Sequence, residues 1–353
     1  MGYKDLGKDI SFAELAVRRS LEHNRSVKMM DRINKVVSWK NIDALLREYY
    51  EVGVSKEGAD AYPPLMLLKA LLLQKWFRIP SDPELENQIN DRISFKKFLD
   101  LPLDKPSPDH STFSRFRGRL SKEAMIELNN AVLREFAKRG LSINEGIAVD
   151  ARLVKSASRP MSNDGLKELK EKRSTTEGQV DKNGKPLKFS RDVESDWTVK
   201  KDEPHYGLKE HASVDIKNGL VLATTVSAAS VHDTKYLPYL TLASCHTENP
   251  IKKVYADKGY YGEPNRSFLH LNEIEDGIMR KDSSTAKITE IEVERNKKIS
   301  KKRYIVEQYF GLSHLHDGAY QARFTTIMKN LWDTMCRQMA FNLFRGSKLL
   351  GTT

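Results

Sequence analysis

The segment that decides the fold reads Ile147-Ala148-Val149-Asp150-Ala151-Arg152-Leu153-Val154. It has the length of a strand, and its apolar and β-branched residues are typical of a strand that is buried in a sheet. The pattern of the chain changes here, because the residues before the segment have helical spacing and those after it alternate between strand and helix patterns. We therefore expect a buried strand that opens an α/β region, with Asp150 at the end of its apolar run.

The residues before this strand, up to about 140, predict helices. Pro64 suits the first turn of a helix, and apolar residues follow it at three- and four-residue steps as far as Trp76. Further helices are predicted from Ser81-Asp82 to Leu101-Pro102, over 112–120, and from Ser121 to a stop at Gly140. We therefore predict an all-helical N-terminal domain over residues 1–140.

The residues after the strand fall into a polar stretch and a series of short elements. Residues 156–204 are rich in Lys, Asp, Ser and Gly and poor in apolar residues, which predicts a mobile insertion or loop. Strands are predicted around 210–217 and 220–228, and Asn218-Gly219 between them favours a hairpin because this pair tolerates positive φ. The remaining predictions are a helix over 233–242, a strand over 251–256, a helix over 264–271, a short strand over 276–279, and helices over 292–315 and 320–344.

This order of elements predicts the fold class. Three antiparallel strands followed by parallel strands with covering helices make an α/β mixed sheet. The same order is found in the ribonuclease-H-like fold. We therefore expect a ribonuclease-H-like catalytic domain over residues 141–353, preceded by the helical domain.

Charge and cysteine usage limit the classes of function. Lys+Arg 59 against Asp+Glu 48 gives a net charge of +11, which favours a polyanionic partner such as nucleic acid. Neither Cys245 nor Cys336 belongs to a Cys-x-x-Cys motif, so a zinc site or a disulfide framework is not expected.

The sequence gives no sign of a membrane segment. Residues 1–5 run directly into polar sequence rather than into a signal peptide. The longest apolar stretch, from Leu65 to Phe77, contains charged residues and is too short to cross a bilayer. We expect a cytoplasmic protein.

Three acidic residues are candidates for chemistry. Asp150 and Asp257 each follow an apolar strand, and in open sheets ligands bind at the carboxyl ends of strands, so the two could converge on one site. Glu307 lies on a predicted helix and shares a face with Arg303 and His314. Three hard oxygen donors suit Mg²⁺ or Mn²⁺. The alternatives are that the aspartates are turn or capping residues and that Glu307 forms a surface ion pair with Arg303.

Basic residues gather at two places where DNA could bind. One is a cluster of five cations in seven positions before Glu307: Lys297, Lys298, Lys301, Lys302 and Arg303. The other is a set of three arginines on the short helix over 112–120: Arg115, Arg117 and Arg119. Each set could bind the DNA backbone. Alternatively, the cluster before Glu307 is only a solvated helix face, and the helix over 112–120 only packs against the core through its phenylalanines.

The ordered succession of motifs resembles the DDE transposases of bacterial insertion sequences, especially the group named for insertion sequence 5. The resemblance covers most of the chain. It rests on residues 62–71, Ser81-Asp82, 108–117, Val149-Asp150, 206–211, Val231-His232-Asp233, 256–260, 303–310, Lys329-Asn330 and Phe341-Asn342-Leu343. Related transposases carry a Tyr, Arg, Glu, Lys signature around the third acid. Arg303 and Glu307 keep its spacing, whereas Ser300 stands in place of the tyrosine and His314 in place of the lysine.

The resemblance implies a function and a set of partners. It implies that Asp150, Asp257 and Glu307 hold two Mg²⁺ or Mn²⁺ ions, that the helical domain binds DNA or dimerises, and that Arg303 and His314 lie at the DNA. The reaction would cleave DNA at terminal inverted repeats and join the 3′-OH end to target DNA, with a second copy of the protein as partner in a bacterial nucleoid. The alternatives are a sequence-specific DNA-binding protein without chemistry and a metal-dependent nuclease without strand transfer.

Overall fold

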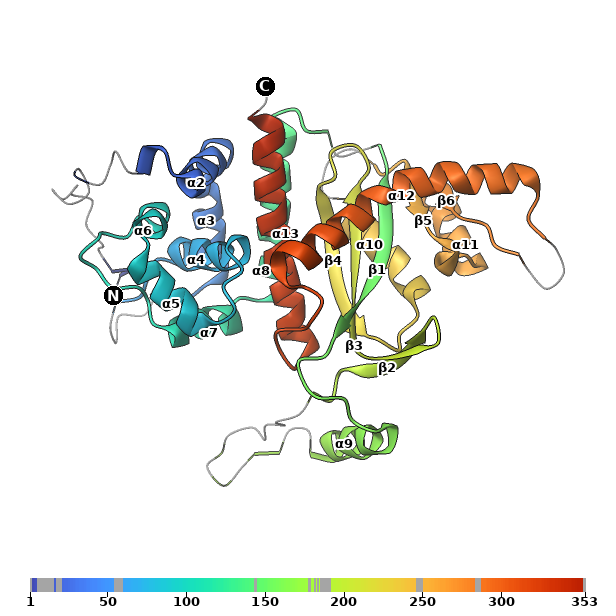
Figure 1. Cartoon of the computed structure of the whole chain (residues 1–353), viewed down its shortest axis with the longest axis horizontal. Helices are drawn as coiled ribbons and strands as arrows, with labels where there is room; N and C mark the ends of the chain where they lie inside the picture. Colours follow the sequence, from blue (N-terminus) through green and yellow to red (C-terminus); the bar gives the residue numbers. More distant parts are fainter. Residues whose placement is uncertain are drawn as a thin grey trace.

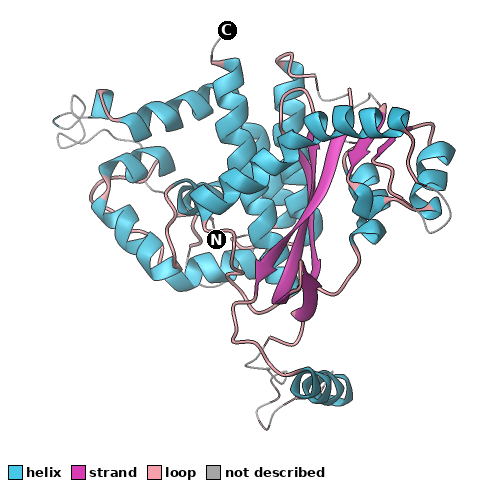
Figure 2. Ribbon diagram, turned by 45° about the vertical axis from the view of Figure 1, so that its right-hand side comes forward, coloured by secondary structure: helices cyan, strands magenta, loops and turns pink. Residues whose placement is uncertain are grey.

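The structure, a computed structural model, combines one mixed sheet with many helices (Figures 1 and 2). It describes residues 2–4, 16, 21–53, 60–142, 145–176, 179–180, 182, 184, 192–245, 250–282 and 287–351. A group of helices from the first part of the chain lies beside the sheet, and further helices lie against both sheet faces.

The sheet has six strands in the order β2-β3-β1-β5-β6, with β4 paired to β3 beside β2. The strands are β1 (Ile147–Lys155), β2 (Asp196–Lys200), β3 (Glu203–Asp215), β4 (Val221–Ala228), β5 (Lys253–Ala256) and β6 (Glu275–Ile278). β3 is antiparallel to β1, β2 and β4, whereas β1, β5 and β6 run parallel. The predicted α/β mixed sheet is confirmed.

The hairpin between β3 and β4 forms where Asn218-Gly219 predicted it. Gly219 has a φ of +66°, a conformation that an L side chain rarely adopts. β3 begins at Glu203, seven residues before the predicted start, because its first half pairs with the short strand β2.

The segment predicted as an insertion or loop contains regular structure. Helix α9 (Asn163–Thr176) and strand β2 both lie within 156–204, and α9 projects below the sheet in Figure 1. Leu166 is the one side chain that α9 buries. The sequence of this helix therefore lacks the apolar residues at three- and four-residue steps that predict a helix. β2 is held by the antiparallel ladder to β3 and by the contact of Trp197 with Tyr206, whose ring centroids are 5.3 Å apart.

The helical prediction for the first part of the chain is confirmed, with one change. The helices are α2 (Arg25–Val36), α3 (Trp39–Tyr49), α4 (Pro64–Trp76), α5 (Asp82–Asp91), α6 (Ile93–Leu99), α7 (His110–Arg119) and α8 (Lys122–Lys138). The single helix predicted to end near Leu101 is two helices, because Arg92 between α5 and α6 has an extended backbone.

Helices cover the sheet on both faces. One face carries α12 (Glu290–Asp317) and α13 (Ile327–Leu350), and a small apolar cluster joins Val306 and Tyr309 of α12 to Ala148 and Ala212 of the sheet. The opposite face carries the short helix η1 (Asp233–Tyr236) and α10 (Leu237–Ala243), with α11 (Glu263–Leu271) against β6.

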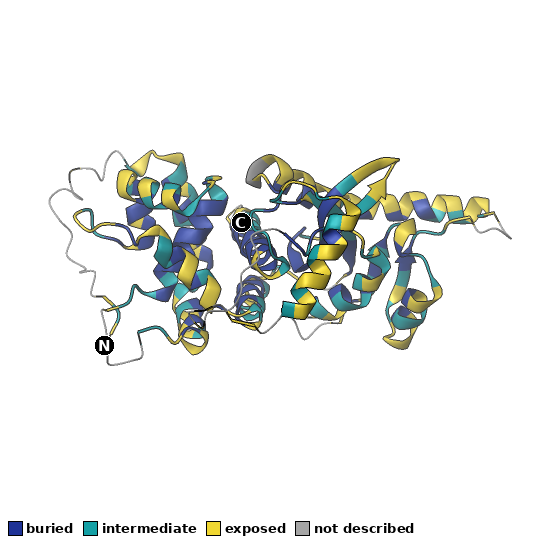
Figure 3. Ribbon diagram, turned by 90° about the horizontal axis from the view of Figure 1, so that it is seen from below, coloured by how far each residue is buried: buried dark blue, intermediate teal, exposed yellow. Residues whose placement is uncertain are grey.

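Helix α13 lies between the N-terminal helices and the sheet (Figure 1). It contacts α2, α4 and α8 on one side and β4 on the other, and one hydrophobic cluster includes buried residues from α2 to α13. Figure 3 shows buried residues along α13 and exposed residues along the projecting end of α12. Within the described part of the chain, no helix combines the length and apolarity that crossing a membrane requires.

Candidate active site

The pairing of β1 with β5 brings the two candidate aspartates together. Ile147 lies opposite Val254 and Ala148 opposite Tyr255 in this parallel ladder. Continued beyond these pairs, the same register sets Asp257 beside Asp150. Side chains at paired positions point to the same face of a sheet, which here is the face that α12 covers.

Asp257 is shaped by the turn that follows β5. Its backbone is extended, and its Oδ1 accepts a hydrogen bond of 2.8 Å from the Gly259 backbone N–H, capping the short helix η2 (Lys258–Tyr260). A Cβ on residue 259 would lie 2.9 Å from this same oxygen, so a side chain there would displace the carboxylate. The glycine of the Asp-Lys-Gly-Tyr motif therefore allows Asp257 its position.

Helix α12 brings Arg303 and Glu307 over the aspartates. The helix begins with a capping box in which Thr289 and Glu292 bond each other's backbone N–H. The Arg303 side chain is 8% exposed, and its Nη2 lies 3.1 Å from Asp150 Oδ2. Its Nη1 lies 3.8 Å from Oε1 of Glu307, whose side chain is half exposed. The guanidinium thus bridges the first and third acids.

The electrostatics of these residues are coupled. Burial raises the pKa of Asp150 to about 6, Arg303 opposes this rise, and the charges of Asp257 and Glu307 add to it. Burial also raises the pKa of Tyr260 well above its ordinary value, with further contributions from Asp150 and Asp257. The Tyr260 hydroxyl is buried without a hydrogen-bond partner among the described residues, so it is a protonated donor close to the aspartates.

The donor set fits a hard divalent cation in its chemistry, since all three acids offer carboxylate oxygens. Among the residues that the structure describes, however, no three His, Cys, Asp or Glu side chains are gathered in a group that could hold a metal ion. The Arg303 guanidinium, between Asp150 and Glu307, supplies positive charge in this arrangement.

The lysines before Glu307 lie on the outer surface of α12. Lys297, Lys298, Lys301 and Lys302 are all exposed, and together they form what we call the α12 lysine face. His314 is exposed near the end of the same helix, with its ring centroid 5.5 Å from that of Tyr320.

The three arginines of α7 divide into two kinds. Arg115 and Arg119 are exposed, as a DNA-contacting role requires. Arg117 has a side chain that is 10% exposed and forms an ion pair with Asp82 of α5. Arg117 therefore joins two helices of the N-terminal group and does not lie on the exposed face with its neighbours.

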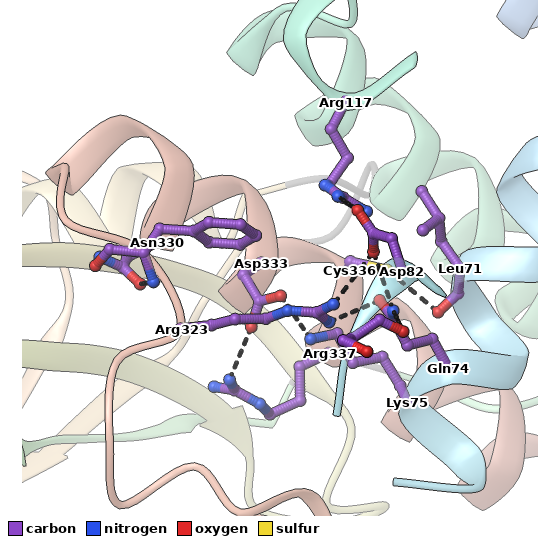
Figure 4. Close-up of polar contacts among 12 residues, drawn as sticks. Leu71, Gln74, Lys75, Asp82, Arg117, Arg323, Asn330, Asp333, Cys336 and Arg337 are labelled. Carbon is purple, nitrogen blue, oxygen red and sulfur yellow. Dashed lines mark hydrogen bonds and ion pairs between the residues drawn. The ribbon is translucent and has the colours of Figure 1, made fainter. Parts of the chain in front are cut away.

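A network of buried ion pairs lies next to the site and was not predicted from the sequence. Figure 4 shows part of it, with Asp333 between Lys75 of α4 and Arg337 of α13, and Asp82 contacted by Arg117 and Arg323. Beyond this view, Arg337 also binds Glu210 of β3 at 3.1 Å. Glu210 is an acidic residue within β3, which is buried over most of its length, and this charge was a signal that could have indicated the network.

In the Val231-His232-Asp233 motif, the side chains of His232 and Asp233 each have a structural partner. His232 is the N-cap of η1, since its side chain accepts a hydrogen bond from the Thr234 backbone N–H. Asp233 Oδ1 lies 2.9 Å from Lys209 Nζ. Asp233 is therefore an ion-pair partner of β3.

Comparison with known protein families gives two matches that follow one another along the chain. Residues 18–119 match a family described as a transposase domain (DUF772), and residues 143–315 match the family described as the transposase DDE domain. The second match contains Asp150, Asp257 and Glu307. No solved structure is detectably similar to the chain. The two family matches together cover most of the sequence, and the chain belongs to the DDE-type transposases.

Proposed function

We propose that Asp150, Asp257 and Glu307 are the catalytic acids of this transposase and together hold two Mg²⁺ or Mn²⁺ ions. The observation that supports this most directly is the β1–β5 register, which sets Asp257 beside Asp150 on the face that carries Glu307. Such ions would lower the pKa of the attacking water and stabilise the leaving oxygen of the phosphodiester.

The other residues of the site would prepare it for phosphate. Arg303 pairs with Asp150 and would also donate to a phosphate oxygen of the scissile strand. Tyr260 keeps its proton and would donate to an aspartate carboxylate, which fixes the orientation of that ligand.

We further propose that two surfaces bind DNA. The α12 lysine face and His314 would bind the backbone of the strand that is cut and joined. Arg115 and Arg119 of α7 would bind the terminal inverted repeat, which gives the helical part of the chain, residues 1–140, its role in end binding and dimerisation. The catalytic part, residues 141–353, would then act on target DNA as one half of a homodimer.

The test is incubation of the purified protein with labelled element ends, target duplex and Mg²⁺. Joined products support transposition; cut ends without joining indicate a nuclease, and binding alone indicates a DNA-binding protein without chemistry. Asp150→Asn, Asp257→Asn and Glu307→Gln should each abolish cleavage and leave end binding intact.

Asp215→Asn is the matched control, because Asp215 is a buried acid of the same sheet that lies outside the site. Cleavage at the wild-type rate by any one of the three triad variants would overturn the assignment of that acid.

A further inference from the structure

A buried carboxylate on β3, Glu210, lies beneath α12. Its side chain is 2% exposed and accepts four hydrogen bonds. Tyr309 donates its hydroxyl proton to Oε1 at 2.9 Å. Arg152 donates from Nη2 and Nε to Oε2, at 2.5 and 3.1 Å, and Arg337 donates from Nη1 to the same oxygen at 3.1 Å. Glu210 is therefore fixed from β1, α12 and α13 at the same time.

Two of these partners hold α12 itself. Tyr309 is a residue of the helix, and Arg152 donates a third hydrogen bond, of 3.2 Å, to the backbone carbonyl of Phe310. Both contacts fall within three residues of Glu307. The apolar contacts of Val306 and Phe310 are not directional, whereas hydrogen bonds to a fixed carboxylate set the rotation and height of this turn.

Stability alone does not account for this arrangement. Taking a carboxylate and two guanidinium groups out of water is so unfavourable that apolar replacements of buried ion pairs are often neutral or stabilising. This polar centre is attached to the helix that carries Arg303 and Glu307, so we interpret its role as fixing the position of that helix.

We propose that Glu210, together with Tyr309 and Arg152, is the positioning centre that sets α12 so that Glu307 and Arg303 face Asp150. None of the three touches DNA or metal in this proposal; they act through the helix. The proposal rests on the proposed function of Glu307, and its experiment separates the two.

The experiment compares Tyr309→Phe with Tyr206→Phe. Each substitution removes one buried tyrosine hydroxyl that donates a hydrogen bond: Tyr309 to Glu210, and Tyr206 to the backbone carbonyl of Asp192 at 3.2 Å. Tyr206 lies on β3, away from α12. For each protein, we would measure DNA cleavage against Mn²⁺ concentration, affinity for element ends, and the midpoint of thermal unfolding.

We expect Tyr309→Phe to cleave about 10- to 100-fold more slowly, or to need that much more Mn²⁺ for half-maximal cleavage, as when a group supporting a metal ligand is removed. End binding should be unchanged, and Tyr206→Phe should cleave like the wild type. Equal behaviour of the two variants, or a loss that follows only the thermal midpoint, would overturn the positioning centre.

Two further variants complete the test. Arg152→Lys keeps the charge but cannot bond both Glu210 and the Phe310 carbonyl in the same way, so it should reproduce the Mn²⁺ dependence if Tyr309→Phe folds poorly. Glu307→Gln distinguishes the two levels of inference. If it abolishes cleavage and Tyr309→Phe does not impair it, only the positioning centre fails; if Glu307→Gln cleaves normally, the proposed function fails and the positioning centre with it.

Discussion

Asp150→Asn should make the protein more stable at neutral pH while abolishing cleavage. Burial raises the pKa of Asp150 to about 6 from an ordinary 3.8, so the folded protein binds this proton more tightly than the unfolded chain does. At about 1.36 kcal/mol per pH unit, the difference corresponds to about 3 kcal/mol. Asparagine, which is never charged, avoids that penalty.

The pH dependence follows from the sign of this shift. The favourable contribution of protonated Asp150 is fully present below pH 3.8 and is lost as pH rises through about 6. Asp150→Asn should therefore raise the free energy of unfolding by about 3 kcal/mol at pH 8 and leave it nearly unchanged at pH 3.5.

Urea unfolding at several pH values measures this difference. Asp215→Asn is an informative comparison, because burial also raises the pKa of Asp215 to about 6 and this acid lies outside the site. Mg²⁺ should stabilise the wild type and Asp215→Asn but not Asp150→Asn. The reasoning would be refuted if Asp150→Asn were no more stable than the wild type at pH 8. It would also be refuted if the gain in stability were the same at pH 8 and pH 3.5.

Three further predictions concern the site, the DNA surface and the buried ion pairs. Gly259→Ala should reduce cleavage at least about tenfold with little change in thermal midpoint, because its Cβ displaces the Asp257 carboxylate; a wild-type cleavage rate would contradict this. Replacing the α12 lysine face by glutamines should make the slope of log affinity against log salt shallower by about 2 to 4, measured by fluorescence anisotropy; an unchanged slope would show that DNA binds elsewhere. Lys75→Met should lower the free energy of unfolding in urea by about 3 kcal/mol, because it leaves Asp333 buried without one of its two cations; a change below about 1 kcal/mol would mean that this pair is readily solvated.

The fold could be predicted wherever burial gives a regular pattern. β1 and α4 are apolar over most of their length, and both were predicted to within a residue or two. α9 and β2 were missed because each has few buried side chains, so their structure depends on neighbours that periodicity does not reveal. The break at Arg92 was missed because no proline or glycine marks it.

The site could be predicted only in part, since strand ends indicate candidates but not their surroundings. Asp150 and Asp257 follow apolar runs, a local signal. The contact of Arg117 with Asp82 joins residues 35 positions apart, and that of Glu210 with Tyr309 joins residues 99 apart. Such pairings depend on how helices and strands pack, and no local pattern in the sequence distinguishes them from exposed charges.

The position of α13 has a consequence for how the protein folds during its synthesis. During synthesis this helix leaves the ribosome after every other described element, yet Asp333 is needed by Lys75 of α4 and Arg337 by Glu210 of β3. Until it arrives, Lys75 lacks Asp333 and Glu210 lacks one of its two arginine partners, and both deficits favour a loose, hydrated chain over a closed one. A polypeptide that lacks α13 should therefore be an easy substrate for proteases.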